Sequence, residues 1–423
     1  MKPILDSVAA PSDKRMCSPR LLAWFLLLGC LTPTFAQTTV LAPLQSDLQS
    51  LPQTPQQSSQ LLVTPKPSVA EPTFLQWGPV TAHPRATYRF VSTTGLLVMK
   101  GEAADTTIQT VAPGIMLELG AQWTLDYQPS WNYYSSRKFT DTIDHSVMLN
   151  GATVYDNWTL RLSQSFTRST QPLLETGAQT RVDQYATVFD VRTRLDGHLA
   201  LESAATQNMS YTTNLNDSKD WSLLEWLHFQ YSQRLDTAIG AGPGYVEINK
   251  GPDTTYSRFL GQIDWRPGTK FNLHLDAGID HRKVRTANSH YTDNPITNAS
   301  VGYKIFEHTA LTFGGFRTIT VPYSPNQALI KNLGWNVSLD QRLLGRLNLT
   351  LAAGYQKSNY EQSTITATEA REDNNHWYDA RLSTAVLQRG SVSVFYHTSK
   401  NTSSVQGYGF SSNQTGLELS YRY

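Results

Sequence analysis

The residues of this sequence whose type and spacing could form a functional site are charged residues spaced two apart. Asp190, Arg192 and Arg194 alternate with uncharged residues, and Asp280 and Arg282 repeat the spacing. Successive side chains of an extended strand point to opposite faces, so each alternating set shares one face. Mixed carboxylates and guanidinium groups on one face can line a hydrated channel or cross-link a filled interior. The residues that we predict to line one common interior are Arg161, Asp190, Arg192, Arg194, Arg258, Asp264, Asp276, Asp280, Arg282, Asp340, Asp379 and Arg381.

These residues do not indicate a catalytic or metal site. The nearest approaches to an acid–base pair are His145 beside Asp144 and His281 beside Asp280. Neighbours along a strand point to opposite faces, so neither pair can act together. The 10 His residues show no metal-ligand spacing, and no glycine-rich loop precedes a helix. We therefore predict that the protein is not an enzyme and takes no cofactor.

The elements that must position the charged residues are strands with one apolar face. Leu347, Leu349 and Leu351 alternate with polar residues, and segments 271–280 and 332–340 repeat this period of two. No helix or long hydrophobic strand is left over to cover the apolar faces. In hydrocarbon every backbone polar group must be paired internally, which an alternating chain achieves by closing its sheet into a ring. The pattern therefore favours an all-β membrane barrel over a soluble sandwich or propeller.

Composition excludes two other classes of protein. After residue 36 the 423-residue chain has no run of about 18 apolar residues, which excludes a bundle of spanning helices. Its 35 Lys and Arg residues balance 34 Asp and Glu residues, so it lacks the basic excess of a nucleic-acid binder.

Connections of alternating length predict the strand number. Short turns alternate with longer polar stretches, as in outer-membrane barrels, where the short set faces the periplasm. The turns imply a transmembrane antiparallel up-and-down barrel of about 18 strands, with 16 possible, from a first strand near 85–99 to a last near 415–423. We place the short turns near Gly120, Asp156, Asp196-Gly197, Asp236, Pro267-Gly268, Glu307, Leu344-Gly345 and Arg389-Gly390.

Three segments allow two interpretations each. Trp221–Leu235 fits one face of a helix as well as a strand, and we predict a strand. The longest loop, Ser358 to Asn375, is either an inward constriction or an ordinary solvated loop. The aromatic cluster of Trp123, Tyr127, Trp131, Tyr133 and Tyr134 is either a stacking surface for sugars or part of the aromatic girdle at a membrane interface.

The N-terminal segments are predicted to address and tether the protein. Basic residues precede the apolar stretch Leu21–Gly29, and Thr34-Phe35-Ala36 provides a cleavage site, so residues 1–36 are predicted to be a signal peptide. Both cysteines lie within it, although acylation of Cys30 is a rival interpretation. Residues 37–80 are predicted to be a Pro-, Gln- and Ser-rich linker, and residues 81–423 the barrel.

The end of the chain resembles the terminal strand of bacterial outer-membrane barrels. Leu417, Leu419, Tyr421 and Tyr423 alternate with polar residues up to the last position. This resemblance implies recognition of Leu417–Tyr423 by the barrel-assembly machinery. The segments Phe74-Leu75-Gln76-Trp77-Gly78-Pro79-Val80 and His83-Pro84-Arg85-Ala86-Thr87-Tyr88 resemble the entry to outer-membrane β-barrel porins associated with exopolysaccharide systems. That resemblance implies passive diffusion or polysaccharide export and no catalytic residues.

We thus expect an outer-membrane, porin-like channel for small polar solutes, and the resemblance adds an association with polysaccharide export. A non-conducting structural or surface-adhesion barrel is the alternative. The expected partners are outer-membrane lipid, lipopolysaccharide, and polysaccharide or cell wall, with no nucleic acid.

Overall fold

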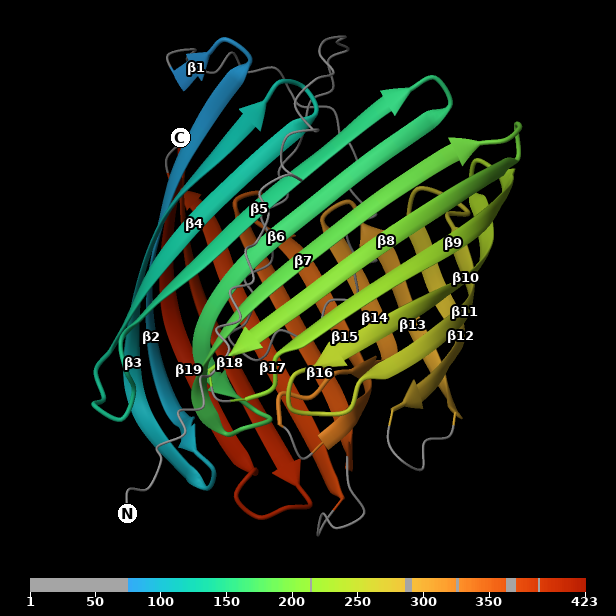
Figure 1. Ribbon diagram of the computed structural model, residues 1–423. Coiled ribbons are helices and arrows are strands. Elements are labelled where there is room, and N and C mark those ends of the chain that lie inside the picture. Colours follow the sequence, from blue (N-terminus) through green and yellow to red (C-terminus); the bar gives the residue numbers. More distant parts are fainter. Residues whose placement is uncertain (1–74, 214, 286–290, 325–326, 363–369, 387–388) are drawn as a thin grey trace, which may run out of the picture.

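The computed structural model describes residues 75–423 except 214, 286–290, 325–326, 363–369 and 387–388, so the predicted signal peptide and most of the predicted linker lie outside the described residues. A two-residue strand, β1 (Gln76–Trp77), pairs with the start of β2. Every following strand pairs antiparallel with its neighbours in chain order (Figure 1). Within the described part of the chain, no helix has the length and apolarity to cross a bilayer.

The sheet closes on itself because the last strand pairs with β2. Leu417 pairs with Phe90 and Tyr421 with Ala86, and the backbone N–H of Tyr423 donates to Pro84 O at 2.9 Å. The result is a closed antiparallel barrel of 18 strands, which confirms the predicted fold class. Its strands are β2 (Val80–Met99), β3 (Glu102–Leu119), β4 (Trp123–Tyr134), β5 (Thr142–Tyr155), β6 (Trp158–Leu173), β7 (Ala178–Arg194), β8 (Leu199–Thr212), β9 (Ser218–Ser232), β10 (Leu235–Ile248), β11 (Thr254–Trp265), β12 (Phe271–Val284), β13 (Tyr291–Phe306), β14 (Thr309–Thr320), β15 (Gln327–Leu343), β16 (Leu347–Gln362), β17 (Arg371–Val386), β18 (Gly390–Ser403) and β19 (Phe410–Arg422).

Short connections gather at one end of the ring. Each predicted short turn falls between two consecutive strands at that end, although the turn expected near Asp236 lies at residues 233–234. Asp156 and Leu344 hold positive φ angles of 51° and 49°, as the tightest hairpins require. The ambiguous segment Trp221–Leu235 forms a strand and not a helix: it is β9 up to Ser232, followed by a two-residue turn and Leu235, the first residue of β10.

At the end of the barrel away from the short turns, the strands extend further than the sequence pattern predicted. They run for 12 to 20 residues, whereas about 9–11 tilted residues cross a bilayer. The extra length shortens the predicted long loops. The loop predicted at Ser358 to Asn375 is strand at both ends, and residues 363–369 lie outside the described residues.

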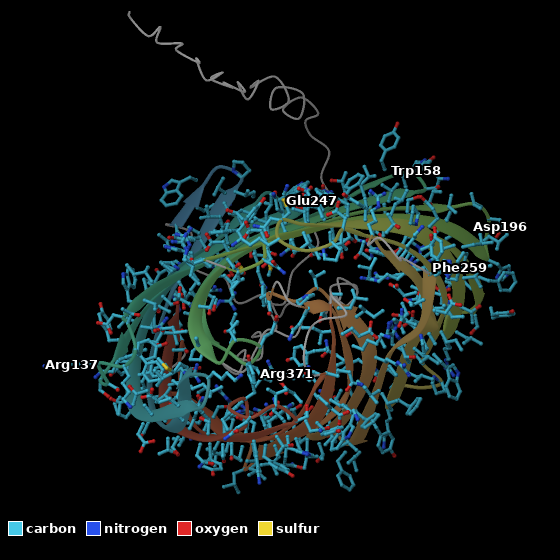
Figure 2. The ribbon with its side chains drawn as sticks, turned by 60° about the horizontal axis from the view of Figure 1, so that its bottom comes forward. Arg137, Trp158, Asp196, Glu247, Phe259 and Arg371 are labelled. Carbon is cyan, nitrogen blue, oxygen red and sulfur yellow. The ribbon has the colours of Figure 1, made fainter. Side chains whose placement is uncertain are left out.

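The outer face of the ring is apolar. In β19, Leu417, Leu419 and Tyr421 are 38%, 41% and 48% exposed, whereas Glu418 and Gln414 on the other face are buried. Trp158 and Phe259 likewise lie at the outer margin of the ring (Figure 2). This arrangement inverts that of a soluble protein and matches a sheet surrounded by hydrocarbon.

One carboxyl group interrupts the apolar band. Glu225 lies midway along β9, between the exposed side chains of Leu223 and Leu227. Ser203 Oγ on β8 donates a hydrogen bond to its carboxylate at 2.5 Å. Carboxyl groups facing lipid at this depth are costly, so Glu225 departs from the pattern of its surroundings.

Candidate functional site

The candidate functional site is the inner wall of the barrel, where the predicted charged residues gather into ion-paired networks. Arg161 on β6 lies 2.6 Å from Asp190 on β7 and 3.4 Å from Glu202 on β8. Arg192 lies 3.6 Å from Glu202 and 3.3 Å from Asp236 on β10. Because the carboxylates are shared, this network ties four strands together across the wall.

A second network surrounds Asp280 on β12. Arg258 Nε and Arg282 Nε donate to its two carboxylate oxygens at 3.1 and 2.9 Å. Both guanidinium groups lie over the ring of Tyr256, 4.6 and 4.5 Å from its centroid, and the Tyr256 hydroxyl donates to Asp220 at 2.7 Å. Asp280 is 0% and Arg282 2% exposed, so these charges are compensated by each other rather than by water.

Two smaller groups hold further predicted residues. His274 lies between Asp264 and Asp276, with its ring nitrogens 2.9 and 3.0 Å from their carboxylates. Arg381 Nη1 lies 3.5 Å from Glu418 Oε1, across strands β17 and β19.

The remaining predicted residues lie apart from these networks. His397 lies 3.5 Å from Asp379, and Asp340 accepts a hydrogen bond from Thr350 Oγ1 at 2.7 Å. Arg194 is the exposed last residue of β7, at the rim with the short turns.

The His–Asp neighbours considered for catalysis lie on opposite faces of the sheet. Asp144 is buried and accepts a hydrogen bond from Asn132 Nδ2 at 2.9 Å, whereas His145 stacks on Tyr127 at the outer face. Asp280 faces Arg282, whereas His281 contacts Asp293 at 2.5 Å. The strand geometry therefore separates both pairs. Among the described residues, no group of three or more His, Cys, Asp or Glu side chains is arranged to hold a metal ion.

The aromatic cluster near β4 is divided between the two faces. Alternation puts Trp123, Tyr127, Trp131 and Tyr133 on the outer face, where Tyr127 and Tyr133 are 38% and 50% exposed. Tyr134 packs against Phe139 with ring centroids 5.4 Å apart. The outward residues therefore occupy girdle positions rather than a sugar-facing wall.

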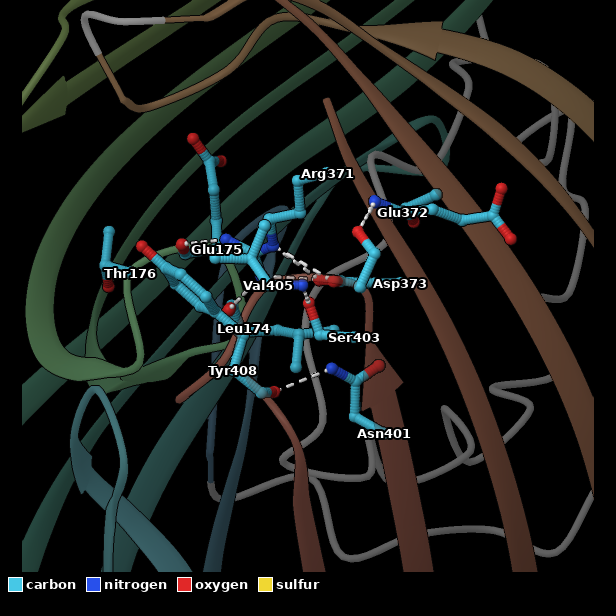
Figure 3. A network of polar contacts seen from close by, with 12 residues as sticks. Leu174, Glu175, Thr176, Arg371, Glu372, Asp373, Asn401, Ser403, Val405 and Tyr408 are labelled. Atoms are coloured by element: carbon cyan, nitrogen blue, oxygen red, sulfur yellow. Dashed lines mark hydrogen bonds and ion pairs between the residues drawn. The ribbon is translucent and has the colours of Figure 1, made fainter. Parts of the chain in front are cut away.

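The β6–β7 hairpin bends into the interior of the ring. Its tip, residues 174–177, which we call the hairpin tip, lies next to Arg371 (Figures 2 and 3). Near its tip the hairpin reaches the end of β2, which is not a neighbour of β6 or β7 in the sheet. A Cβ added to Gly177 would lie 3.7 Å from the carbonyl carbon of Met99, the last residue of β2, and 3.3 Å from the backbone of Lys100 in the following turn. Among the described residues the inward element is thus the hairpin tip, whereas residues 363–369 of the Ser358 to Asn375 loop lie outside the described residues.

Arg371 fixes the hairpin tip to the far wall. Its guanidinium group donates to Leu174 O at 3.0 Å and to Glu175 O at 2.8 Å (Figure 3). The same group donates to Asp373 at 2.5–3.0 Å and lies 3.5 Å from the ring centroid of Tyr408. Arg371 is 5% and Asp373 1% exposed along the side chain, so the contact is a buried charge pair with two added backbone acceptors.

Glu175 makes a second contact between the hairpin tip and the opposite wall. Its carboxylate accepts a hydrogen bond from the backbone N–H of Ser324, in the β14–β15 connection, at 2.6 Å. Burial raises the pKa of Glu175 to about 7, and hydrogen bonds from the Tyr323 and Ser324 backbone oppose that rise. The tip therefore carries a group that changes charge near neutral pH.

Sequence reasoning missed several members of the site. Asp236 was assigned to a turn and Arg371 to a loop, whereas His228, which lies 3.6 Å from Glu202, was not considered. The alternation of β9 around Trp226 and His228 was a usable signal, because both share the face of Asp220. Nothing local marked Glu175, because its partners are distant in the chain.

Comparisons with known proteins give the fold a context. No family model matches the sequence, and no curated protein matches it. Similar solved structures include three from Pseudomonas aeruginosa. OpdL is 14% identical over 82% of this chain and 99% of its own, with a TM-score of 0.44, and OpdQ is 12% identical over 82% of this chain and 99% of its own, with a TM-score of 0.46. OccK2 (OpdF) in complex with glucuronate is 13% identical over 81% of this chain and 97% of its own, with a TM-score of 0.45. At these identities and scores, the likeness adds nothing to the strand order and register given above.

Proposed function

We propose that the protein is an outer-membrane channel for the passive diffusion of small polar solutes. The observation that carries this proposal is the contrast between an apolar outer face and an inner face of Arg–carboxylate networks in a closed ring of 18 strands. A ring of this size is too wide for side chains alone to fill, so its interior holds water. Of the charged residues predicted from the sequence, the partly exposed ones, such as Arg161 and Arg192, then line the solute path.

The hairpin tip favours small solutes over polymers. It crosses the interior and is held at the far wall by Arg371, so it narrows the passage. Export of a polysaccharide would require this contact to open. We therefore place diffusion of small solutes ahead of the polysaccharide association suggested by the entry segments.

Conductance in planar bilayers tests the proposal. Purified mature protein is expected to give ohmic single-channel steps in KCl, and Arg192→Glu should shift the reversal potential toward cation preference because it replaces a positive group on the inner wall. Arg168→Glu, which changes an Arg on the outer face of the neighbouring strand, is the matched control.

One result would overturn the proposal, and a second would correct the placement of Arg192. A protein that is folded and heat-modifiable yet leaves the bilayer sealed would support the non-conducting structural barrel. An unchanged reversal potential in Arg192→Glu would remove that residue from the solute path.

A further inference from the structure

The inner wall has one sector without charge, formed by the inner-face residues of segments 298–302, 312–316, 334–338 and 352–356. We call this sector the neutral wall. These segments lie side by side in β13–β16, in continuous register. Throughout these described segments the inward side chains are only Asn, Gln, Ser, Thr, Gly, Ala and one Phe. The wall is bounded by the charged groups Asp276 and His274 on β12 and Asp379 on β17.

Asn336 occupies the centre of the neutral wall. It is exposed, and its register partners on both sides are glycines, Gly314 and Gly354. No hydrogen bond between described residues engages the side chains of Asn336 or Asn298. Gln356, at the edge of the wall, differs because it donates to Asn332, which lies just beyond the wall and donates in turn to Thr320. The side chains of Asn336 and Asn298 therefore present free amide donors and acceptors to the interior.

Two aromatic rings flank this amide. Phe316 lies over Gly334, where an added Cβ would meet the ring at 2.6 Å, and Trp377 lies over Gly354 at 2.5 Å. Both rings are only partly buried. They pack close to the wall because the glycines beneath them have no side chain.

We infer that the neutral wall binds uncharged, hydroxyl-rich solutes, with simple sugars and polyols as the class; this inference rests on the proposed channel function. A sugar ring has hydroxyl groups at its edge, which an amide can bind as donor or acceptor, and C–H groups on its faces, which pack on aromatic rings. A charged solute finds no counter-charge on this wall. The Arg and carboxylate groups of the two networks described above are already bound to one another.

Three sugars of equal ring size distinguish the solute classes: glucose, glucuronate and glucosamine. With the full mature protein in planar bilayers, glucose is expected to raise the noise of the KCl current in a saturable way. The two charged analogues should do so at higher concentrations. In proteoliposome swelling, glucose should enter fastest.

Variants of the wall locate the effect. Asn336→Ala should raise the half-saturating glucose concentration about fivefold, as expected for one lost hydrogen bond, and Trp377→Leu should act in the same direction. Asn348→Ala, on the inner face of β16 nearer the short turns, is the matched control and should change nothing. If Trp377→Leu fails to fold, Gly314→Ala gives a second route, because its Cβ would lie 2.3 Å from Asn336 Oδ1 and displace that amide.

The outcomes separate this inference from the proposed function. A sealed bilayer would reject the channel itself. Ohmic conductance with equal responses to the three sugars would reject only the neutral wall as a binding site, as would an Asn336→Ala variant that behaves like Asn348→Ala.

Discussion

Releasing the hairpin tip should widen the channel. In the double variant Arg371→Ala/Asp373→Ala, the tip loses two charge-assisted hydrogen bonds, to Leu174 O and Glu175 O. Removing Asp373 as well avoids leaving a buried carboxylate without its partner. Each bond is worth about 1.5–3 kcal/mol, so the loss is roughly 3 kcal/mol or more. We expect single-channel recordings to show a larger conductance, with dwell times in the narrow state shortened about 100-fold.

A matched pair on the same hairpin provides the control. Arg168 on β6 binds Asp183 on β7 with two bonds of 2.8 Å, but this pair lies on the outer face. Arg168→Ala/Asp183→Ala should therefore leave the conductance unchanged. Parental conductance and dwell times in the Arg371 double variant would refute the assignment of the tip as the constriction.

Three further predictions concern titration, buried charge and the lipid face. The pKa of Glu175 is about 7 while the tip is held in place and near its ordinary 4.5 once the side chain is hydrated. The held position therefore binds the proton more tightly and is favoured most below about pH 4.5. As the pH rises to about 7, the free energy that favours the held position falls by roughly 3 kcal/mol. Narrow states should last longer at pH 5 than at pH 8, and Glu175→Gln should abolish that difference; a difference that survives would place the titrating group elsewhere. Asp280→Ala leaves Arg258 and Arg282 without their carboxylate and should cost about 3–5 kcal/mol in urea unfolding from vesicles, whereas an unchanged midpoint would mean that water reaches them. Glu225→Leu should raise the same stability by roughly 1 kcal/mol, and a loss would show that the hydrogen bond from Ser203 outweighs the cost of a carboxyl group facing lipid.

The barrel could be predicted from sequence because its information is local. The alternation of Leu347, Leu349 and Leu351 with polar residues reports one strand with two different surroundings. Short turns such as Leu344-Gly345 then fix the order of the strands. Repeated along the chain, these two signals predict about 18 strands, with 16 possible, without any long-range contact.

The constriction could not be predicted because its information is not local. Glu175 and Arg371 are 196 residues apart, and each lies in a polar stretch like those at other connections. From the sequence, Ser358 to Asn375 was either an inward constriction or a solvated loop, and the strands extend into that stretch at both ends. What decides the inward fold is a buried Arg within reach of two backbone carbonyls, which composition does not reveal.

The neutral wall could be predicted from the sequence only in part. Alternation already assigned Asn336 and Ser338 to the polar face, so the lack of charge at these positions of the wall could be read from the sequence. The placement of Phe316 and Trp377 over glycines depends on register between strands, which a single sequence does not give.

The seam between β2 and β19 has a consequence for protein engineering. These strands meet as ordinary antiparallel neighbours, and β2 starts at the same rim where β19 finishes. A short peptide linker could therefore join residue 423 to residue 80, and new termini could be introduced at any other hairpin turn on that rim. Such circular permutants should recover the same ring, each inserting with a different strand in the final position.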